Sequence, residues 1–576
     1  MADRAKWRVR KPPVDLDPAV VRRAGAAGKL GAALLHNRGV RDERSAARYL
    51  SPRLEDLTDP AALPGMPAAV QRLVKAARRG ERIGVLGDFD VDGLTGAAVL
   101  VHAIRGLGAQ VTPHIPDRAA DGHGLAMGTV DMFHAAGVSL IVTADTGSTA
   151  PAEVAYAAAR GVDTIVTDHH LFNGQLPLAC AVVNPNRQGT PGESTGLSGA
   201  GVAFRVAQAL DRAFGRETPR HLVALAALGT VADLAPLVGD NRPIVAAGLK
   251  ELDHTSHPGL RSLLEKARDD SRAARGPVDT ETIAFHVGPR LNAPGRLGSS
   301  LLSLRLLTTS DPDEADAIAS EIEALNAERQ KLSRSAWAIA EAQVSKLSGH
   351  PPLLAVVSQE LTSGVLGPLA GRLCAEYGRP SVAVHLEGGT ARASARSTEN
   401  FDIHAAIAAQ ASSLVRYGGH ARAAGFTCDE KLLGAVLDAL SRSAEAALGE
   451  PEPSYVTADA EVGFAELGAG VWTFVQMMAP FGEGNPAPLF FTRGMLPMQV
   501  RTLGPAGDHL RLVLDGGARR YDAIGFGLGG ASLGSGLIDA VYSLRSDHWN
   551  GRVRNELELK TIRPSAPTGS PPGPGR

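Results

Sequence analysis

Three aspartates spaced by two residues form the group in this chain best suited to chemistry. Residues 87–93 read GDFDVDG, with carboxylates at Asp88, Asp90 and Asp92. In an extended backbone, residues i, i+2 and i+4 share one face, so we expect the three carboxylates to lie together. Such close carboxylates raise each other's pKa unless a cation lies among them. The alternative is that they are turn residues that cap a following helix.

Further acidic and imidazole groups come directly after other apolar runs, and they are Asp145, Asp168, His169, His170 and Asp233. Each one alone would be a turn residue or a helix cap. Together, oxygen ligands with an imidazole suit Mn²⁺ or Mg²⁺ better than structural zinc. The number of carboxylates exceeds what one ion needs, which predicts two ions. Two divalent ions about 3.5–4 Å apart are the recurrent arrangement for phosphoester hydrolysis.

The composition permits a nucleic-acid enzyme without demanding one. A length of 576 residues indicates about four domains, and 59 Lys and Arg against 61 Asp and Glu give a net charge of −2. No chain-wide positive field follows, although a local basic groove is enough to bind nucleic acid. The three cysteines are far apart, which excludes a disulfide framework and a thiolate zinc site. The charged N-terminus and the absence of a long apolar stretch predict a cytoplasmic protein without membrane association.

A parallel sheet is the element that would bring the acidic residues together. Between residues 82 and 183, short β-branched runs alternate with Ala-rich stretches, at 83–86, 111–115, 140–143, 164–166 and 181–183. Ligands of such sheets collect beyond the carboxyl ends of the strands. Residues 313–344 contain no Gly or Pro and predict a long connecting helix. A second α/β region begins with strands at 353–357 and 381–384.

The last part of the chain has a different pattern. Short alternating strands at residues 509–514, 520–524, 539–544 and 555–560 predict a small β-barrel or sandwich. Residues 525–530 match GxGxxG, but a further Gly-rich run follows, so we predict a loop. The Pro- and Gly-rich residues 564–576 predict a disordered tail.

Several motifs in combination resemble the DHH phosphoesterase superfamily, and within it the RecJ-type single-stranded-DNA-specific exonucleases. They are GDFDVDG, ADTGS, VTDHH, GTVADLAPL, GPRLNAPGRLG and YGGHARAAGF, and the likeness spans residues 45–563. The resemblance implies an α/β multidomain protein. Its parts are an N-terminal segment (1–45), a parallel-sheet DHH metal-binding catalytic domain (46–300), a connecting helix (301–348), a DHHA1-like substrate-binding domain (349–450), a C-terminal OB-like β-barrel that binds single strands (451–563) and the tail (564–576).

The resemblance also implies the roles of the acidic and imidazole residues. The expected ligands of two Mn²⁺ or Mg²⁺ ions are Asp88, Asp90, Asp92, Asp145, His169 and Asp233, with Asp145 between the ions. The expected catalytic residues are Asp145, Asp168 and His170, and His170 faces the substrate phosphate. One departure is Thr146, where family members commonly have Asn. We expect activity to survive it, because a hydroxyl also forms hydrogen bonds.

Arginine and glycine residues supply the candidates for substrate binding. Arg290, Asn292 and Arg296 occur in residues 288–296, which we expect to form a Gly/Pro-shaped loop that contacts phosphate, since arginine forks onto phosphate oxygens. The alternative is a surface loop with solvated arginines. Residues 418–420 alone would be a turn. The resemblance instead assigns substrate binding to all three of these residues, Gly418, Gly419 and His420. It assigns the same role to Arg118, Gly364, Arg372, Ser394 and Arg396.

The function that the resemblance implies is 5′→3′ exonuclease activity on single-stranded DNA, with release of 5′-mononucleotides, in recombination and repair. We expect a monomer, and the candidate protein partners are a single-strand-binding protein or a helicase. One alternative is a DHH-family phosphodiesterase or phosphatase of short oligonucleotides or cyclic dinucleotides. Those enzymes tend to have a His at the position of Leu86. The other alternative is a non-catalytic repair or replication scaffold, against which the intact acidic set argues.

Overall fold

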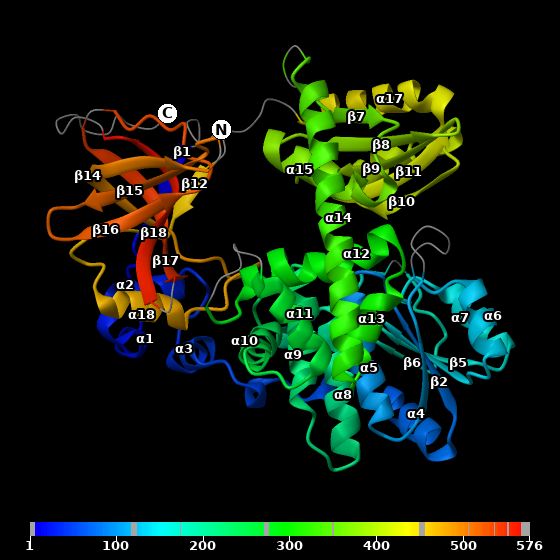
Figure 1. The fold of residues 1–576 in the computed structure, drawn as a ribbon. Helices are drawn as coiled ribbons and strands as arrows, with labels where there is room; N and C mark the ends of the chain where they lie inside the picture. Colours follow the sequence, from blue (N-terminus) through cyan, green and yellow to red (C-terminus); the bar gives the residue numbers. More distant parts are fainter. Residues whose placement is uncertain are drawn as a thin grey trace. The chain divides into compact units, whose positions relative to one another are not determined.

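The computed structural model describes residues 6–116, 124–172, 174–269, 276–347, 349, 351–448, 455–504, 506–534, 536–549 and 552–565 (Figure 1). The chain divides into two compact units. The first consists of Met1–Gly288, Leu304–Asp316 and Pro453–Arg576, and the second consists of Pro289–Ser303 and Ala317–Glu452. In the described part of the chain, no helix is both long enough and apolar enough to cross a membrane.

A five-stranded parallel sheet lies at the centre of the first unit, in the order β3-β2-β4-β5-β6. The strands are β2 (Arg82–Gly87), β3 (Gln110–His114), β4 (Leu140–Ala144), β5 (Asp163–Thr167) and β6 (Ala181–Val183). All five correspond to predicted β-branched runs, and all neighbouring pairs are parallel. The sequence prediction of a parallel sheet is therefore confirmed.

Helices cover both faces of this sheet. On one face, α5 (Val91–Arg105) and α8 (Gly199–Ala213) contact the strands, and α9 (Arg220–Ala232) and α10 (Asn241–Leu252) continue the helical layer. On the other face lie α6 (Met127–Ala135) and α7 (Pro151–Ala159), visible in cyan in Figure 1. Phe133 and Val154 of these two helices pack against Ile141 and Val166 of the sheet. Two apolar layers thus hold the strand ends in place.

The C-terminal part of the first unit is a closed barrel. Its strands β14 (Phe490–Leu503), β15 (His509–Asp515), β16 (Arg520–Gly525), β18 (Arg552–Pro564) and β17 (Ile538–Trp549) pair in that order, and β17 pairs with β14 to close the ring. Four of these strands contain the predicted runs. The sequence did not predict β14, because Gly494 and Pro497 interrupt its pattern. Strand β16 ends at Gly525, and residues 526–530 form the predicted loop.

The N-terminal residues share the core of the barrel. Strand β1 (Lys6–Val9) pairs with β12 (Tyr455–Ala458), and Leu34 and Leu35 of α2 (Gly28–His36) are buried in one cluster with Leu512 of β15. The same cluster contains Trp472 and Phe474 of α18 (Ala469–Met477). The expected N-terminal segment and the expected barrel domain therefore form one hydrophobic core.

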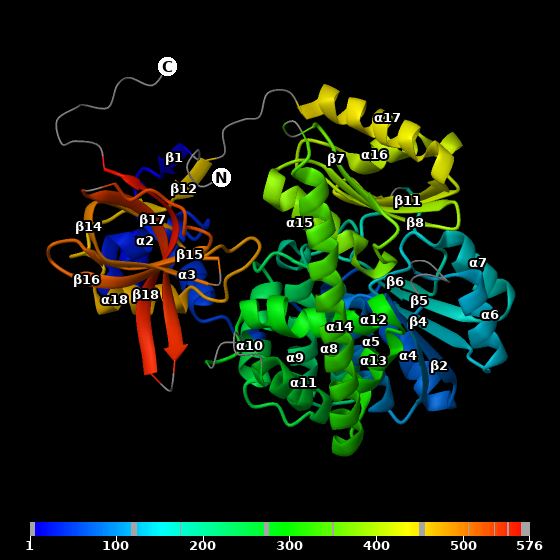
Figure 2. The same ribbon diagram turned by 45° about the horizontal axis from the view of Figure 1, so that its top comes forward.

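The second unit contains a five-stranded mixed sheet in the order β10-β11-β9-β8-β7 (Figure 2). Its strands are β7 (Leu354–Ser358), β8 (Ser381–Glu387), β9 (Thr390–Arg396), β10 (Arg416–His420) and β11 (Ala423–Asp429). Helix α15 (Ser363–Tyr377) packs on one face, and α16 (Ile403–Ala408) and α17 (Glu430–Leu448) pack on the other. The predicted long helix is confirmed as α14 (Pro312–Val344), which follows α13 (Leu301–Thr308).

Two remaining sequence predictions concern the cysteines and the tail. Cys180, Cys374 and Cys428 are free, as their spacing predicted. Strand β18 extends to Pro564, and the Ser565 N–H donates to the Leu537 carbonyl at 2.8 Å. The prediction of disorder is therefore wrong for Pro564 and Ser565, and the rest of the predicted tail, residues 566–576, lies outside the described part of the chain.

Candidate metal centre

The carboxyl ends of three adjoining strands place three aspartates at one edge of the parallel sheet. Asp88 follows β2, Asp145 follows β4 and Asp168 follows β5. The backbone N–H of each donates to the last residue of the next strand, at 3.2 Å for Asp88 to Ala144, 3.0 Å for Asp145 to Thr167 and 3.1 Å for Asp168 to Val183. This ladder of hydrogen bonds aligns the three backbones, as expected for a parallel sheet.

The segment after β2 turns into a helix, so the prediction that it stays extended is wrong. Asp90 is the N-cap of α5, and its carboxylate accepts hydrogen bonds from the N–H groups of Asp92 and Gly93 at 3.0 and 3.1 Å. A capping carboxylate satisfies N–H groups that the start of a helix leaves without a partner, which explains the early turn. Asp92 lies in the first helical turn and is buried. The capping alternative is thus correct for Asp90, yet the carboxylates still gather.

The N-terminus of α8 holds the Asp92 carboxylate. The N–H groups of Gly199 and Ala200 donate to its two oxygens at 2.7 and 2.9 Å. Gly199 also permits close packing, because a Cβ atom there would lie 2.6 Å from Oδ1 of Asp145. Sequence reasoning missed Gly199. The available signal was the run Ser198-Gly-Ala-Gly201, in which Ser198 caps the helix.

The structure brings all six predicted metal ligands into three overlapping groups, in each of which the ligand atoms lie within 4.8 Å of one another. The groups are Asp88 with Asp90 and Asp145, Asp145 with His169 and His170, and Asp92 with His169 and Asp233. Asp145 and His169 each belong to two groups. Shared members of this kind are what two neighbouring ions require.

Two buried atoms at the centre of these groups fit a metal ion. Nε2 of His169 lies 3.0 Å from Oδ1 of Asp145, and 3.7 Å from carboxylate oxygens of Asp92 and Asp233. Neither Nε2 of His169 nor Oδ1 of Asp145 makes a hydrogen bond to any residue that the structure describes. Buried polar atoms rarely lack a hydrogen-bond partner. Carboxylates with one imidazole are a donor set suited to Mn²⁺ or Mg²⁺.

Electrostatics point to the same conclusion. Burial raises the pKa of Asp145 well above its usual value, and the surrounding charges of Asp92, Asp90, Asp168 and Asp88 add to the effect. Burial followed by Asp92 and Asp90 raises the pKa of Asp233 to about 8, and burial also raises the pKa of Asp92. A divalent cation among these groups would offset the repulsion that disfavours their charged forms.

Asp168 is arranged to orient its neighbours. Its Oδ1 lies 2.9 Å from Nδ1 of His170 and accepts hydrogen bonds from the N–H groups of His169 and His170, while Oδ2 accepts from the N–H of Ser148 at 2.9 Å. The hydrogen bond to Asp168 raises the pKa of His170 to about 9. Because both carboxylate oxygens are engaged, this geometry favours a positioning role for Asp168.

Two asparagines after β6 also hold this loop, and sequence reasoning missed both. Nδ2 of Asn184 donates to the carbonyl oxygen of His170 at 3.0 Å and to Oγ of Ser148 at 2.8 Å. Nδ2 of Asn186 donates to the carbonyl oxygen of His169 at 2.5 Å. The signal was a polar pair directly after a predicted strand, in Val183-Asn-Pro-Asn186.

Four of the predicted substrate-binding residues lie close together in the second unit. Nη1 of Arg296 donates to the carbonyl of Gly364 at 3.3 Å, and Nη1 of Arg396 donates to Oγ of Ser394 at 3.4 Å. The two pairs meet at α15, because a Cβ on Gly367 would lie 3.2 Å from Nη2 of Arg396. Arginine, hydroxyl and backbone groups in one place form a candidate phosphate site.

Residues 288–297 form helix α12 (Gly288–Leu297), so the predicted loop is wrong. Pro294 lies inside the helix, and burial of Leu291 and Ala293 stabilises a helix that the local sequence disfavours. Arg290 is buried, and its Nε donates to Glu323 at 2.6 Å. Asn292 is half-buried. Phosphate contacts by Arg290 and Asn292 stay predictions. The ion pair of Arg290 with Glu323 does not support a phosphate contact by Arg290.

The other predicted substrate residues occupy varied places. The guanidinium of Arg372 lies 3.7 Å over the ring of Trp337. Gly418, Gly419 and His420 are exposed on strand β10, which corrects the turn expected from their sequence alone. Gly418 pairs with Gly425, which pairs with Ser394 on the next strand. Arg118 lies outside the described residues.

Comparisons with known proteins identify the family. Family models match at three places, the DHH family N-terminal domain at residues 82–230, the DHHA1 domain at 350–446 and the RecJ OB domain at 458–561. The single-stranded-DNA-specific exonuclease RecJ of Thermus thermophilus is 36% identical over 98% of this chain and 79% of its own length. The corresponding values for RecJ of Bacillus subtilis are 32%, 97% and 71%. Those for RecJ of Escherichia coli are 33%, 92% and 95%.

Solved structures agree with these matches. The crystal structure of RecJ from Thermus thermophilus in complex with Mn²⁺ has a TM-score of 0.83 at 34% identity, and the match covers 98% of this chain and 81% of that chain. A structure of exonuclease RecJ bound to manganese has a TM-score of 0.60 at 36% identity, over 68% of this chain and 96% of that chain. With DHH, DHHA1 and RecJ OB regions in the same order and identity of this level over nearly its whole length, the chain belongs to the RecJ family.

Proposed function

We propose that this chain is a single-stranded-DNA-specific 5′→3′ exonuclease that hydrolyses terminal phosphodiesters and releases 5′-mononucleotides. The observation that carries the proposal is the overlap of three ligand groups through Asp145 and His169 at one edge of the parallel sheet. The names of the RecJ relatives support the single-stranded DNA substrate and the exonuclease activity. The polarity and the product follow from family membership.

Two Mn²⁺ or Mg²⁺ ions would be held by one set of side chains, namely Asp88, Asp90, Asp92, Asp145, His169 and Asp233. Bound there, divalent ions supply an activated water and neutralise charge on the phosphate. Asp168 holds His170 through Nδ1 and favours its protonated form, so His170 faces the phosphate as a cation. In the reaction, the water oxygen joins phosphorus, the bond from phosphorus to the 3′ oxygen breaks, and that oxygen leaves with a proton.

Each part of the chain has a separate role in this proposal. Residues 46–300 form the catalytic domain, residues 301–348 connect it to the next part, and residues 349–450 bind the strand end. The Arg396–Ser394 pair of residues 349–450, together with Arg296, which donates to the Gly364 carbonyl, supplies donors for a terminal phosphate. Residues 451–563 form the barrel that binds the strand farther from its end.

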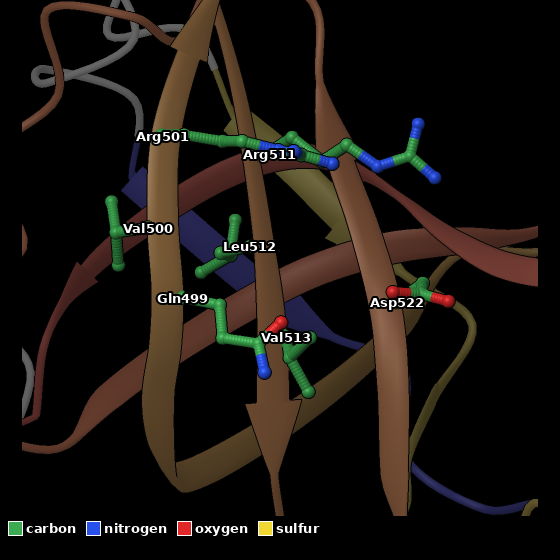
Figure 3. A pocket seen from close by; sticks show the side chains of 7 residues that line it. All are labelled: Gln499, Val500, Arg501, Arg511, Leu512, Val513 and Asp522. Carbon is green, nitrogen blue, oxygen red and sulfur yellow. The ribbon is translucent and has the colours of Figure 1, made fainter.

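A shallow groove on the barrel supports strand binding there. It has a volume of about 290 Å³ and is lined by Gln499, Val500, Arg501, Arg511, Leu512, Val513 and Asp522. Arg501 and Arg511 are paired on neighbouring strands, and Figure 3 shows their side chains across the same end of the groove. Two guanidinium groups beside apolar side chains suit a single strand, which presents phosphates and bases together. Asp522 and the nearby Glu556, 3.6 Å from Arg511, moderate the positive charge.

The cellular setting forms part of the same proposal. Exonuclease action on single strands suits recombination and repair, with a single-strand-binding protein or a helicase as partner. We propose a monomer in the cytoplasm, and the three free cysteines suit the reducing conditions of that compartment.

The test uses single-stranded DNA labelled at either end, a duplex of the same sequence, and the full chain with and without Mn²⁺. The expected result is Mn²⁺-dependent release of mononucleotides from the 5′ end of the single strand, little action on the duplex, and loss of activity in Asp145→Asn. Equal degradation of the duplex would contradict the proposal. Preference for dinucleotides or cyclic dinucleotides would favour the small-substrate phosphodiesterase, and binding without cleavage would favour the scaffold.

A further inference from the structure

Leu234 is an exposed leucine in a backbone conformation that leucine rarely adopts. It directly follows Asp233, its φ is 57°, and 68% of its surface is exposed. In the left-handed region, Cβ approaches the following carbonyl oxygen, which costs conformational energy for every residue except glycine. The chain therefore keeps a leucine where glycine would suit the backbone better.

The position of Leu234 is C′ of a Schellman motif that ends α9. The N–H of Leu234 donates to the Val231 carbonyl at 3.2 Å, and the N–H of Ala235 donates to the Thr230 carbonyl at 3.1 Å. Glycine is the usual residue at this position. Because a glycine would complete the same hydrogen bonds, the end of the helix does not account for the leucine side chain.

The segment around Leu234 is held beside the metal centre. On one side, Oδ2 of Asp233 lies 3.7 Å from Nε2 of His169. On the other side, the N–H of Leu237 donates to the Glu483 carbonyl at 2.7 Å. Leu171, which directly follows His170, is also exposed, at 78%. Two exposed leucines therefore directly follow residues of the metal centre along the chain, and an apolar side chain beside a site suits contact with the ligand bound there.

We propose that the side chain of Leu234 contacts the sugar and base of the terminal nucleotide during hydrolysis. This inference rests on the proposed function, because a phosphodiester bound at the metal centre brings its own nucleoside next to Asp233. A nucleoside has apolar faces on its deoxyribose and its base. In this proposal, these faces pack against the isobutyl side chain of Leu234. Leu234 thereby favours strand ends that carry a base over ends that lack one.

The experiment combines a protein variant with a substrate variant. Wild type and Leu234→Gly are compared on a 5′-phosphorylated single strand and on the same strand with a tetrahydrofuran residue, which has no base, at its 5′ end. For wild type, we expect kcat/KM on the normal strand to exceed that on the abasic strand about tenfold, the range typical of one small apolar contact. In Leu234→Gly the ratio falls to about one, while Leu234→Met, which keeps the apolar volume, retains the wild-type ratio.

Two readouts separate this role from a structural one. Because glycine fits C′, the melting temperature of Leu234→Gly should equal or exceed that of wild type, and its Mn²⁺ affinity should be unchanged. The control is Leu178→Gly, which removes another exposed leucine. Leu178 comes before β6 and thus lies at the opposite edge of the sheet, so this variant should keep the ratio.

Each outcome has a distinct meaning. A wild-type ratio in Leu234→Gly, or the same loss in Leu178→Gly, overturns the inference and leaves the exonuclease function standing. A marked fall in the melting temperature of Leu234→Gly also overturns it, since the leucine would then stabilise the fold. If wild type releases no nucleotide from the normal strand, the proposed function itself fails.

Discussion

Asn184 donates a hydrogen bond from Nδ2 to the carbonyl oxygen of His170 at 3.0 Å, so a residue beyond the next strand fixes the loop that carries His169 and His170. Asn184 is fully buried, and its Oδ1 accepts a hydrogen bond from the N–H of Asn186 at 2.8 Å. The pair thus holds the backbone at both histidines. Partners of this kind fix the orientation of ligands without touching the metal.

The first prediction concerns Asn184→Asp, which keeps the shape of the side chain and removes both donated hydrogen bonds. Because the carbonyl of His170 then faces a carboxylate, the histidine loop shifts. We expect the affinity for Mn²⁺, measured by isothermal titration calorimetry, to fall about 10- to 100-fold. The matched control is Asn485→Asp. Asn485 is also buried and donates from Nδ2 to two carbonyls, those of Met478 and Pro480, neither of which belongs to a predicted metal ligand. Equal losses in both variants would contradict a specific role for Asn184.

The second prediction concerns Gly199→Ala. An added Cβ would lie 2.6 Å from Oδ1 of Asp145, a distance that forces the carboxylate to move. A displacement of about 1 Å in a catalytic group can cost on the order of 100-fold in rate, so we expect a loss of kcat of that size on single-stranded DNA. Gly128→Ala in α6, where a Cβ meets no atom within 4 Å, should retain full activity. Normal kcat in Gly199→Ala would show that Asp145 need not occupy its observed position.

The third prediction concerns metal-free stability. Burial and four neighbouring carboxylates raise the pKa of Asp145, so its charged form destabilises the folded protein when no cation is bound. We expect Asp145→Asn to raise the melting temperature in EDTA, because the amide removes the buried charge and keeps the shape of the side chain. Mn²⁺ should raise the melting temperature of wild type and leave that of Asp145→Asn nearly unchanged. An equal Mn²⁺ effect on both proteins would argue against Asp145 as a ligand.

Much of this site could be predicted from the sequence because its residues follow buried strands. Asp88, Asp145 and Asp168 come directly after β-branched runs, and parallel strands bring their carboxyl ends to one edge. What the sequence hid depends on long-range contacts. Asn184 and Gly199 act through the backbone of His170 and the carboxylate of Asp145, and the local signals at both residues do not reveal these distant partners.

The secondary structure also contains elements that the local sequence predicts and elements that only long-range packing explains. Regular runs such as β2 were evident, whereas β14 contains Gly494 and Pro497 and is stabilised by its neighbours in the closed barrel. Helix α12 forms although Pro294 disfavours it, because burial outweighs local propensity. The core that joins α2 to the barrel has a practical consequence. Removing residues after 451 would expose that core, so the barrel is better tested by point substitutions in the full chain.

The fourth prediction therefore concerns the barrel groove in the intact protein. Arg501→Ala with Arg511→Ala removes two guanidinium groups that face the proposed strand path. Each phosphate contact on single strands contributes about −0.7 to the slope of log K against log salt concentration, so the slope should become about 1.4 less negative. Binding of a long strand, measured by fluorescence anisotropy in EDTA, should weaken severalfold, while binding of a tetranucleotide stays the same. Arg442→Ala, an exposed arginine on α17, is the control for lost charge. An unchanged slope would show that the strand does not contact the groove.

The last prediction concerns pH and a cluster of three histidines away from the metal centre. The ring of His102 on α5 lies 4.7 Å from that of His221 on α9 and 5.3 Å from that of His257, which precedes α11 (Pro258–Asp269). Burial lowers the pKa of His221 to about 4 and that of His257 to about 3, and it also lowers the pKa of His102, to which the charge of Arg105 contributes. Nε2 of His221 and Nε2 of His257 have no hydrogen-bond partner among the described residues. The fold therefore keeps this cluster neutral.

Unfolded histidine takes up a proton near pH 6.5, so below that pH the unfolded chain binds more protons than the folded chain. The free energy of unfolding should consequently fall as the pH drops from about 6.5 towards 4, and the cluster should have no effect above about pH 7. At 1.36 kcal/mol per pKa unit and two pH units below 6.5, His221 and His257 together account for a loss on the order of 5 kcal/mol near pH 4.5. Melting temperatures from pH 7.5 to 4.5 should fall less steeply in His257→Asn than in wild type. His134→Asn, which removes an exposed histidine of α6, should follow the wild-type profile, and parallel profiles for all three proteins would disprove the role of the cluster.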